Sequence, residues 1–357
     1  MMDEIKVSVI VPAYNTDAYI ERMIMCLLKQ TYKNLQLIFI DDGSTDKTAE
    51  IIKSFTDPRI EYYYQNNSGV SAARNSGLNK ATGDKIFFFD SDDTFEPSLI
   101  RDCIEYAKAN NIESVLYGYG NKIDGKITNE HVFRLDGIYR NERIINELVP
   151  AFLGHSFADV NQWLRGERGQ REGKEHTALW RIMLDASVVK ENQLLFDTSL
   201  WLGEDTKFIN TYFLFTHSVG ILKKTLYYLT IREGSANVTS DGNPVFMAQN
   251  KEKLIAARKE IDTLSAKRGI DTHIYWQGTL VLSAVQLALR LSHDKRGGWK
   301  VFQQYMANED VRYAIKEFKP DVVTLKSIPF FLLRGNLEGV LYMLFKITPN
   351  KLINKLL

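Results

Sequence analysis

The segment 85–97, with the sequence KIFFFDSDDTFEP, constrains this chain more than any other stretch. Its apolar residues 86–89 have the length and composition of a buried parallel strand. Three carboxylates follow within four positions, at Asp90, Asp92 and Asp93. Because crowded like charges repel one another, the pattern favours a divalent cation between them, and the oxygen-only donor set suits Mg²⁺ or Mn²⁺.

The alternative interpretation of these carboxylates is an acidic cap on the helix that follows. Asp93 or Thr94 would then be the N-cap residue, and Pro97 would lie in the first helical turn. Capping accounts for one acidic residue in this segment, whereas the sequence places three there.

The composition is that of an enzyme-sized globular chain. With 357 residues, 45% hydrophobic and 25% charged, it is long enough for about two domains. Its two cysteines, Cys26 and Cys103, lie in helix-like patterns, which favours a reducing, intracellular compartment over a disulfide framework. The N-terminus shows no secretory pattern, and the most apolar stretch, 328–345, is interrupted by Arg334 and Glu338. We therefore expect a cytoplasmic protein that is not integral to a membrane.

Charge is distributed unevenly along the chain. Residues 245–357 carry 18 Lys and Arg against 10 Asp and Glu, although the net charge of the whole chain is only +1. This basic tail is also where apolar helical patterns concentrate, which makes an anionic membrane surface, a partner protein or a second copy the candidate partners. No arginine-rich run or nucleic-acid motif accompanies the charge, so we expect no nucleic-acid partner.

The first hundred residues alternate strand and helix as a doubly wound α/β sheet does. Because parallel sheets bind ligands at the carboxyl ends of their strands, the polar residues that follow each strand are the candidate site. The predicted strands are 7–11, 35–40, 60–64 and 86–89, and the predicted helices are 19–30, 46–55 and 71–80.

The remainder of the chain is predicted to complete this domain and add a helical region. Residues 162–174, rich in Gly and Arg, are typical of a mobile loop, and a helix is expected over 178–191. Turn residues at 240–242 place a boundary between a catalytic domain, 1–240, and a basic helical region, 241–357. We divide the first domain into a nucleotide-binding half, about 1–98, and an acceptor half, about 99–240. Further helices are predicted at 99–109, 141–153, 203–214, 245–268, 273–293, 299–318, 326–333 and 337–346, with strands at 114–119 and 226–231.

Five segments in this order, VSVIVPAYN, FIDDGSTDKT, SGVSAARNSGL, GDKIFFFDSDD and WLGEDTKF, resemble family 2 of the glycosyltransferases. The resemblance covers about residues 5–235. It implies an α/β fold, a Rossmann-like, doubly wound, mixed but mainly parallel sheet of the A-type nucleotide-sugar class, followed here by the C-terminal helical region. It also implies an inverting enzyme of the kind found in bacterial surface-polysaccharide assembly.

The resemblance implies a nucleotide site at the ends of the first two strands. Pro12, Tyr14 and Asn15 fall where the family packs the base, and Asp42 falls where it binds uracil. An Asx-turn is the alternative for Asp42. Arg74 lies near the start of a helix, whose N-terminal dipole favours a phosphate, and a surface salt bridge is its alternative.

The resemblance also gives the acidic residues two roles. In Asp90-Ser91-Asp92 the second aspartate binds the cation, while the first, with Ser91, orients ribose or metal. In the pair Glu204-Asp205, Asp205 matches the general base that deprotonates the acceptor hydroxyl, and Glu204 is the fallback. The alternative for that pair is favourable charge at a helix N-terminus.

Acceptor and diphosphate contacts are expected from residues in the second half of the domain. Tryptophan suits stacking on a sugar face, and arginine suits phosphate. For the residues of the Gly- and Arg-rich loop, an ordinary solvated loop is the equal alternative. The candidates are Trp163, Arg165, Trp180, Arg232 and Ser235.

Taken together, the motifs predict a glycosyltransferase that uses Mn²⁺ or Mg²⁺, a nucleotide-sugar donor, which we expect to be UDP-linked, and a glycan acceptor of the kind carried on a lipid. Hexosyl or N-acetylhexosaminyl transfer at the inner face of the cell membrane fits this interpretation. The alternatives are a sugar nucleotidyltransferase, which needs a glycine-rich loop where this chain has residues 12–15, and a non-catalytic glycan-binding or scaffolding subunit.

Overall fold

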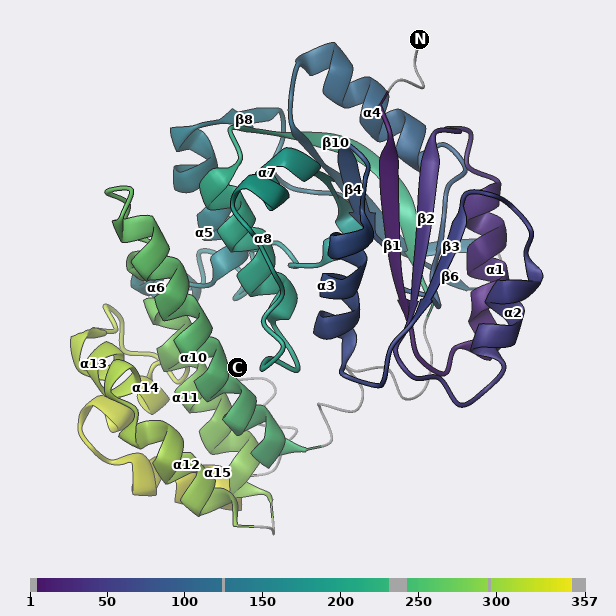
Figure 1. Ribbon diagram of the computed structural model, residues 1–357. Helices are drawn as coiled ribbons and strands as arrows, with labels where there is room; N and C mark the ends of the chain where they lie inside the picture. Colours follow the sequence, from purple (N-terminus) through teal and green to yellow (C-terminus); the bar gives the residue numbers. More distant parts are fainter. Residues whose placement is uncertain (1–4, 124–125, 231–242, 295–296, 349–357) are drawn as a thin grey trace. The chain divides into compact units, whose positions relative to one another are not determined.

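The computed structural model describes residues 5–123, 126–230, 243–294 and 297–348 (Figure 1). It contains two compact units, one made of residues 1–148 with 176–232 and the other of 149–175 with 233–357. The predicted boundary at 240–242 lies outside the described residues, as do Arg232 and Ser235.

Ten described strands of the first unit form one mixed sheet in the order β3-β2-β1-β4-β9-β6-β10-β5, with β7 beside β6 and β8 beside β10. Neighbours β3, β2, β1 and β4 are all parallel, as the alternating pattern predicted. The strands are β1 Val7–Ala13, β2 Leu35–Asp41, β3 Ile60–Tyr64, β4 Lys85–Phe88, β5 Thr94–Phe95, β6 Ser114–Ile123, β7 Lys126–His131, β8 Ile138–Arg140, β9 Ile182–Asp185 and β10 Ser218–Leu229.

Helices cover both faces of the sheet because β1 is apolar on both sides. Val9 and its alternate neighbours pack in one core cluster with Ile24 of α1 (Asp17–Leu28). On the opposite face lies α3 (Val70–Lys80), where a Cβ on Gly77 would come within 2.3 Å of Ile10 Cγ2. A glycine is therefore what lets α3 approach β1 this closely. The other helices of the unit are α2 Thr48–Ser54, α4 Leu99–Asn110, α7 Ala186–Glu191 and α8 Glu204–Phe215, with a π-helix at Ile144–Leu148 and a 3-10 turn at Leu179–Arg181.

The continuous helix expected over 178–191 is wrong. Residues Ile182–Asp185 form β9, which pairs antiparallel with both β4 and β6, and only Ala186–Glu191 is α-helical. Ile182, Met183 and Leu184 are completely buried. A short apolar run of this kind is compatible with either a helix or a buried strand. Here it forms a strand because it pairs with β4 on one side and β6 on the other.

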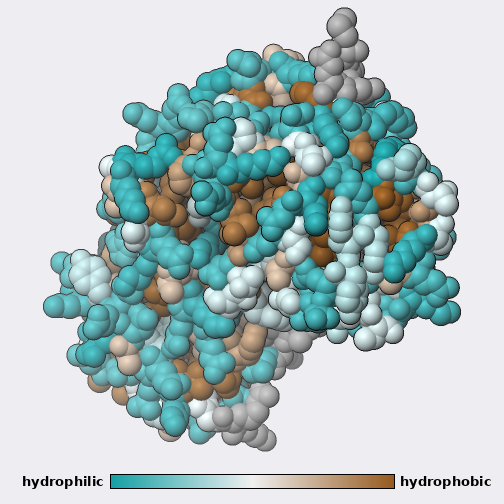
Figure 2. All heavy atoms as spheres, in the orientation of Figure 1, coloured by the Kyte–Doolittle hydropathy of each residue, from teal (hydrophilic) through white to brown (hydrophobic). Residues whose placement is uncertain are grey.

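The second unit is helical. It comprises α5 Val149–Leu153, α6 Phe157–Leu164, α10 Pro244–Ala266, α11 Gln277–Ser292, α12 Gly298–Ala307, α13 Glu309–Glu317, α14 Ile328–Arg334 and α15 Glu338–Ile347. The buried α11 is its centre and contacts α6, α10, α12, α13 and α15. Within the described parts of the chain, none of the helices has the length and apolar content needed to cross a bilayer. The molecular face in Figure 2 is mostly hydrophilic.

Candidate active site

The carboxyl ends of β2, β1 and β4 meet at one edge of the sheet, since these strands are parallel neighbours. Tyr14 and Asn15 follow β1, Asp42 follows β2, and Asp90 comes two residues after β4. This is the edge at which open α/β sheets bind ligands. The structure thus brings together four of the residues that the sequence placed at strand ends.

Asp42 holds the turn that precedes α3 through three hydrogen bonds. Its carboxylate is buried and accepts hydrogen bonds from Gln65 Nε2 at 2.7 Å, the Ser68 amide at 2.9 Å and the Gly69 amide at 2.8 Å. Gly69 has φ +87°, a conformation that favours glycine. Asp42 therefore fixes the turn before α3, a role more extensive than the Asx-turn considered above, and its contact with a base stays a prediction.

The β1 and β2 loops are tied together beside an exposed aromatic ring. The Asn15 side-chain Oδ1 accepts a hydrogen bond from the Thr45 backbone amide at 2.8 Å. The Asn15 backbone amide donates to Ser44 Oγ at 3.0 Å. Pro12 is buried in β1, whereas Tyr14 is 50% exposed. Tyr14 is thus an exposed aromatic residue at this edge of the sheet.

The turn 90–93 presents carboxylates that differ in exposure. The Asp90 side chain is 37% exposed, Asp92 is partly exposed, and Asp93 and Ser91 are buried. Asp93 accepts a hydrogen bond from the Thr230 amide at 2.7 Å. Burial raises the pKa of Asp93 well above its usual range, and the charges of Asp90 and Asp92 raise it further.

The capping interpretation of Asp93 and Thr94 is wrong. Helix α4 begins at Leu99 with Ser98 as its N-cap residue, so Pro97 precedes the helix. Thr94 lies in β5 instead, and Asp93 bonds to the end of β10.

Arg74 connects the two acidic segments. Its Nη1 lies 3.0 Å from Glu204 Oε1 and 2.9 Å from Asp205 Oδ1, and its Nη2 lies 3.5 Å from Asp90 Oδ1. The salt-bridge alternative is confirmed in part, because Arg74 does pair with carboxylates, but at 5% exposure these ion pairs are buried and do not lie on the surface. Burial alone would lower the pKa of Arg74, but the charges of Asp205, Asp90 and Glu204 raise it. A phosphate contact for Arg74 stays a prediction.

The pair Glu204-Asp205 lies in the first turn of α8, preceded by Gly203 at φ +90°. Asp205 is oriented from two sides, by Arg74 through Oδ1 and by the Leu179 amide, 3.3 Å from Oδ2. Burial raises the pKa of Asp205 to about 7, against the opposing charge of Arg74 and with a further increase from Glu204. A carboxylate with this pKa can accept a proton near neutral pH.

The residues at 90–92 fit a divalent cation shared with a ligand. Asp90 and Asp92 are close enough that the charge of Asp92 contributes to the raised pKa of Asp90, in which burial is the largest cause. Among the described residues, no three histidine, cysteine or carboxylate side chains gather as a complete metal site. Magnesium-type ions are often held by one or two carboxylates with substrate phosphates, so this pair suffices when a diphosphate supplies the remaining oxygens.

The tryptophans expected to contact an acceptor are packed inside the protein. Trp180 is 6% exposed and stacks on Tyr227 at a ring distance of 5.0 Å. Trp163 is 4% exposed, lies in the second unit and contacts Phe330. Neither ring presents a face to a sugar. Arg165, also in the second unit, pairs with Glu167 and Asp321.

Two further residues contact the site, Arg22 and Tyr227, and a third, Trp201, lies near it in sequence; none of the three was predicted as a site residue. Arg22 donates to the Asp92 carbonyl oxygen at 2.8 Å, and the Tyr227 hydroxyl accepts from the Asp90 amide at 3.1 Å. Trp201, 42% exposed, lies four residues before Asp205. Its place in the WLGED segment was a usable signal, whereas the distant contacts of Arg22 and Tyr227 leave none in the local sequence.

Known proteins are similar to this chain in sequence. Residues 8–162 match the sequence family described as Glycosyl transferase family 2. The chain is 33% identical to the glycosyltransferase GlyA of Streptococcus pneumoniae over 75% of its own length and 36% of GlyA. It is 27% identical to the putative glycosyltransferase EpsH of Bacillus subtilis over 73% of its own length and 74% of EpsH.

Solved structures extend the likeness in fold. The 1–349 fragment of Staphylococcus aureus TarS, in complex with UDP-GlcNAc, superposes with a TM-score of 0.63 at 18% identity, covering 96% of this chain and 90% of that fragment. At this identity the likeness concerns the fold alone. The chain spans about a third of GlyA and 60% of the uncharacterized glycosyltransferase EpsJ of Bacillus subtilis.

Proposed function

The chain belongs to glycosyl transferase family 2, and we propose that it is an inverting enzyme that moves a sugar from a nucleoside-diphosphate donor to a hydroxyl of a glycan acceptor. The observation that carries this proposal is the network around Arg74. It joins Asp90, at the carboxyl-end edge of the sheet, to the acidic pair Glu204-Asp205, and Glu204 lies 130 residues after Arg74 in the chain. In this proposal, the donor site and the proton acceptor are linked by one set of contacts.

The donor is a UDP-linked sugar in this proposal. Tyr14 offers an exposed ring for the base, and Pro12, Asn15 and Asp42 shape the loops around it. The binding of UDP-GlcNAc by the TarS fragment supports the same donor class.

Asp205 acts as the general base. The acceptor hydroxyl oxygen forms a bond to the anomeric carbon while the bond from that carbon to the diphosphate breaks, and the hydroxyl proton passes to Asp205. Attack from the face opposite the leaving group inverts the anomeric configuration. Arg74 and the Leu179 amide hold Asp205 in one orientation, and Glu204 is the second carboxylate within reach of the same guanidinium.

Asp92 and Asp90 would hold Mn²⁺ or Mg²⁺ together with the donor. Such a cation, when bound, neutralises the charge that develops on the leaving diphosphate. Arg22 supports this function by its hydrogen bond to the Asp92 carbonyl oxygen, and Tyr227 by its hydrogen bond from the Asp90 amide, since both bonds hold the backbone of the turn.

The acceptor is a growing surface glycan, of the kind carried on a lipid at the cytoplasmic face of the membrane. Trp201 is the tryptophan we assign to it, because its exposed ring lies close in sequence to the base, whereas Trp163 and Trp180 are buried. Tryptophan suits the apolar face of a sugar ring. Contacts of Arg232 and Ser235 with the diphosphate stay a prediction, since both lie outside the described residues.

A panel of nucleotide sugars tests this function. The full chain is incubated with each sugar and Mn²⁺ or excess chelator, and release of the nucleoside diphosphate is measured with and without simple glycan acceptors. We expect metal-dependent release of UDP from one or a few donors. Pyrophosphate exchange with UTP would instead support a nucleotidyltransferase, and binding of glycans without turnover of any donor would support a non-catalytic subunit.

A further inference from the structure

Helix α15 is apolar on both of its sides. On one side, Leu341, Tyr342 and Phe345 are buried, and the Tyr342 hydroxyl donates to the Leu291 carbonyl of α11 at 2.6 Å. On the other side, four further apolar residues are exposed, at Val340 (47%), Met343 (56%), Leu344 (42%) and Ile347 (73%). A helix that is hydrophobic all round is normally covered all round. The internal side of α15 is covered by its own unit, so the external side needs another partner.

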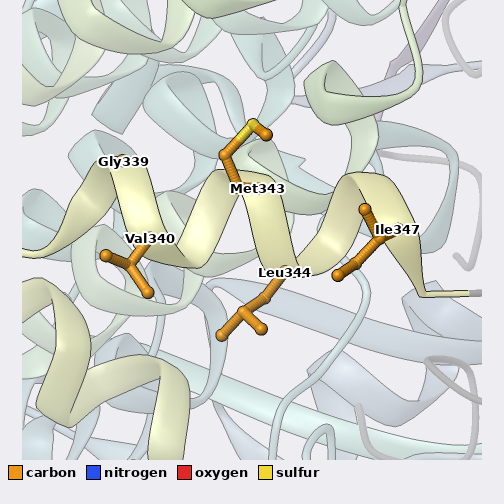
Figure 3. A pocket seen from close by; sticks show the side chains of 5 residues that line it. All are labelled: Gly339, Val340, Met343, Leu344 and Ile347. Atoms are coloured by element: carbon orange, nitrogen blue, oxygen red, sulfur yellow. The ribbon is translucent and has the colours of Figure 1, made fainter.

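The four exposed residues form one surface, which we call the α15 face. Met343, Leu344 and Ile347 lie three, four and seven positions after Val340, so all four side chains fall along one stripe of the helix. With Gly339 they line a shallow depression that is largely open to solvent (Figure 3). Exposed apolar side chains continue into the adjoining segments at Ile328, Phe331 and Leu337.

Basic side chains border the α15 face. Arg334 ends α14 and Lys346 lies in the last turn of α15, both exposed, while Glu338 is the single acidic residue between positions 326 and 348. The sequence beyond the described residues, 349–357, adds two lysines, four Leu or Ile and no acid. An apolar stripe bordered by cations is complementary to an anionic bilayer.

We propose that the α15 face docks on the surface of an anionic membrane, with its apolar side chains inserted at the level of the lipid headgroups and Arg334 and Lys346 facing lipid phosphates. A second copy is the other occupant to consider. Two-fold pairing through α15 would bring like charges together, because Arg334 and Lys346 border this face and Glu338 is the single acid between positions 326 and 348. This inference concerns the second unit and does not depend on the reaction proposed above.

Vesicle co-sedimentation of the full chain tests the proposal. Binding is compared for phosphatidylcholine vesicles with and without phosphatidylglycerol, at low and high salt. We expect preferential binding to the anionic vesicles that weakens with salt. The combined variant M343Q/L344Q/I347Q should bind roughly tenfold less or weaker still, because three inserted apolar side chains are lost. The variant R334E/K346E should lose the preference for anionic vesicles.

Matched controls separate docking from misfolding. I274Q changes an apolar side chain of the same unit that is 46% exposed but outside the α15 face, and should bind like the unaltered chain. All variants replace exposed residues, so their unfolding temperatures should match. Equal binding to neutral and anionic vesicles overturns the proposal, as does absence of binding. If the chain sediments as a dimer that M343Q/L344Q/I347Q converts to monomer, the occupant is a second copy.

Discussion

Replacing Arg74 by methionine should destabilise the first unit, because the guanidinium is the buried cation that faces Asp90, Glu204 and Asp205. Removing one partner of a buried ion pair costs about 3–5 kcal/mol. Since the Asp90 and Asp205 side chains are 37% and 18% exposed, water can compensate part of the loss, and we expect about 3 kcal/mol near pH 8. For a unit of this size that is a fall in Tm of roughly 6–12 °C.

The loss should depend on pH in a defined direction. Burial already raises the pKa of Asp90 to about 6 and of Asp205 to about 7, while Arg74 opposes that increase. Without Arg74 both pKa values rise further. A carboxyl group whose pKa is higher in the folded state than in the unfolded state favours folding at low pH, and this contribution is lost as the pH rises through the folded-state pKa. The deficit of the Arg74→Met variant relative to the unaltered chain should therefore grow from pH 5 to pH 8.

Scanning calorimetry at both pH values measures this deficit. Arg143→Met is the matched control, because Arg143 also pairs with a carboxylate, Glu147, but both side chains are exposed, and we expect little change in Tm. Adding Asp205→Asn to Arg74→Met should recover part of the lost stability, since one uncompensated carboxylate is removed. An unchanged Tm for Arg74→Met at pH 8, or the same fall at pH 5 and pH 8, would refute the compensated network.

Three further substitutions test the proposed reaction. Asp92→Asn should abolish metal-dependent donor binding in titration calorimetry while leaving the Tm near normal, because its charge faces a cation rather than the core; turnover in excess chelator would contradict this role. Asp205→Asn should keep donor affinity but lower transfer about 10²–10⁴-fold, and a normal rate, together with inactivity of Glu204→Gln, would assign the base to Glu204. Trp201→Ala should raise the KM for acceptor without changing hydrolysis of the donor, and Trp201→Tyr should restore much of the loss; an equal fall in both rates would instead indicate a structural role.

The local sequence was sufficient for the parallel half of the sheet and for the acidic motifs. Strands β1 to β4 alternate with helices in the predicted order, with bounds within two residues of the prediction, and Asp42 and Asp90 follow their strands as expected. These features are local: a run of apolar residues and the polar residue that ends it lie within ten positions of each other. The direction of parallel strands then places their ends at one edge without further information.

The tertiary structure decided which distant residues meet. Nothing in the sequence around Arg74 indicates whether its partner is a ligand phosphate or the carboxylates of Glu204 and Asp205, because a single buried cation is compatible with either. The apolar run Ile182–Asp185 became a strand because β4 and β6 offered open backbone hydrogen bonds between them. Trp180 is likewise buried through a distant contact, because it stacks on Tyr227 of β10. Hydrophobic periodicity determines that a residue is buried, but only the folded chain determines which residues it packs against.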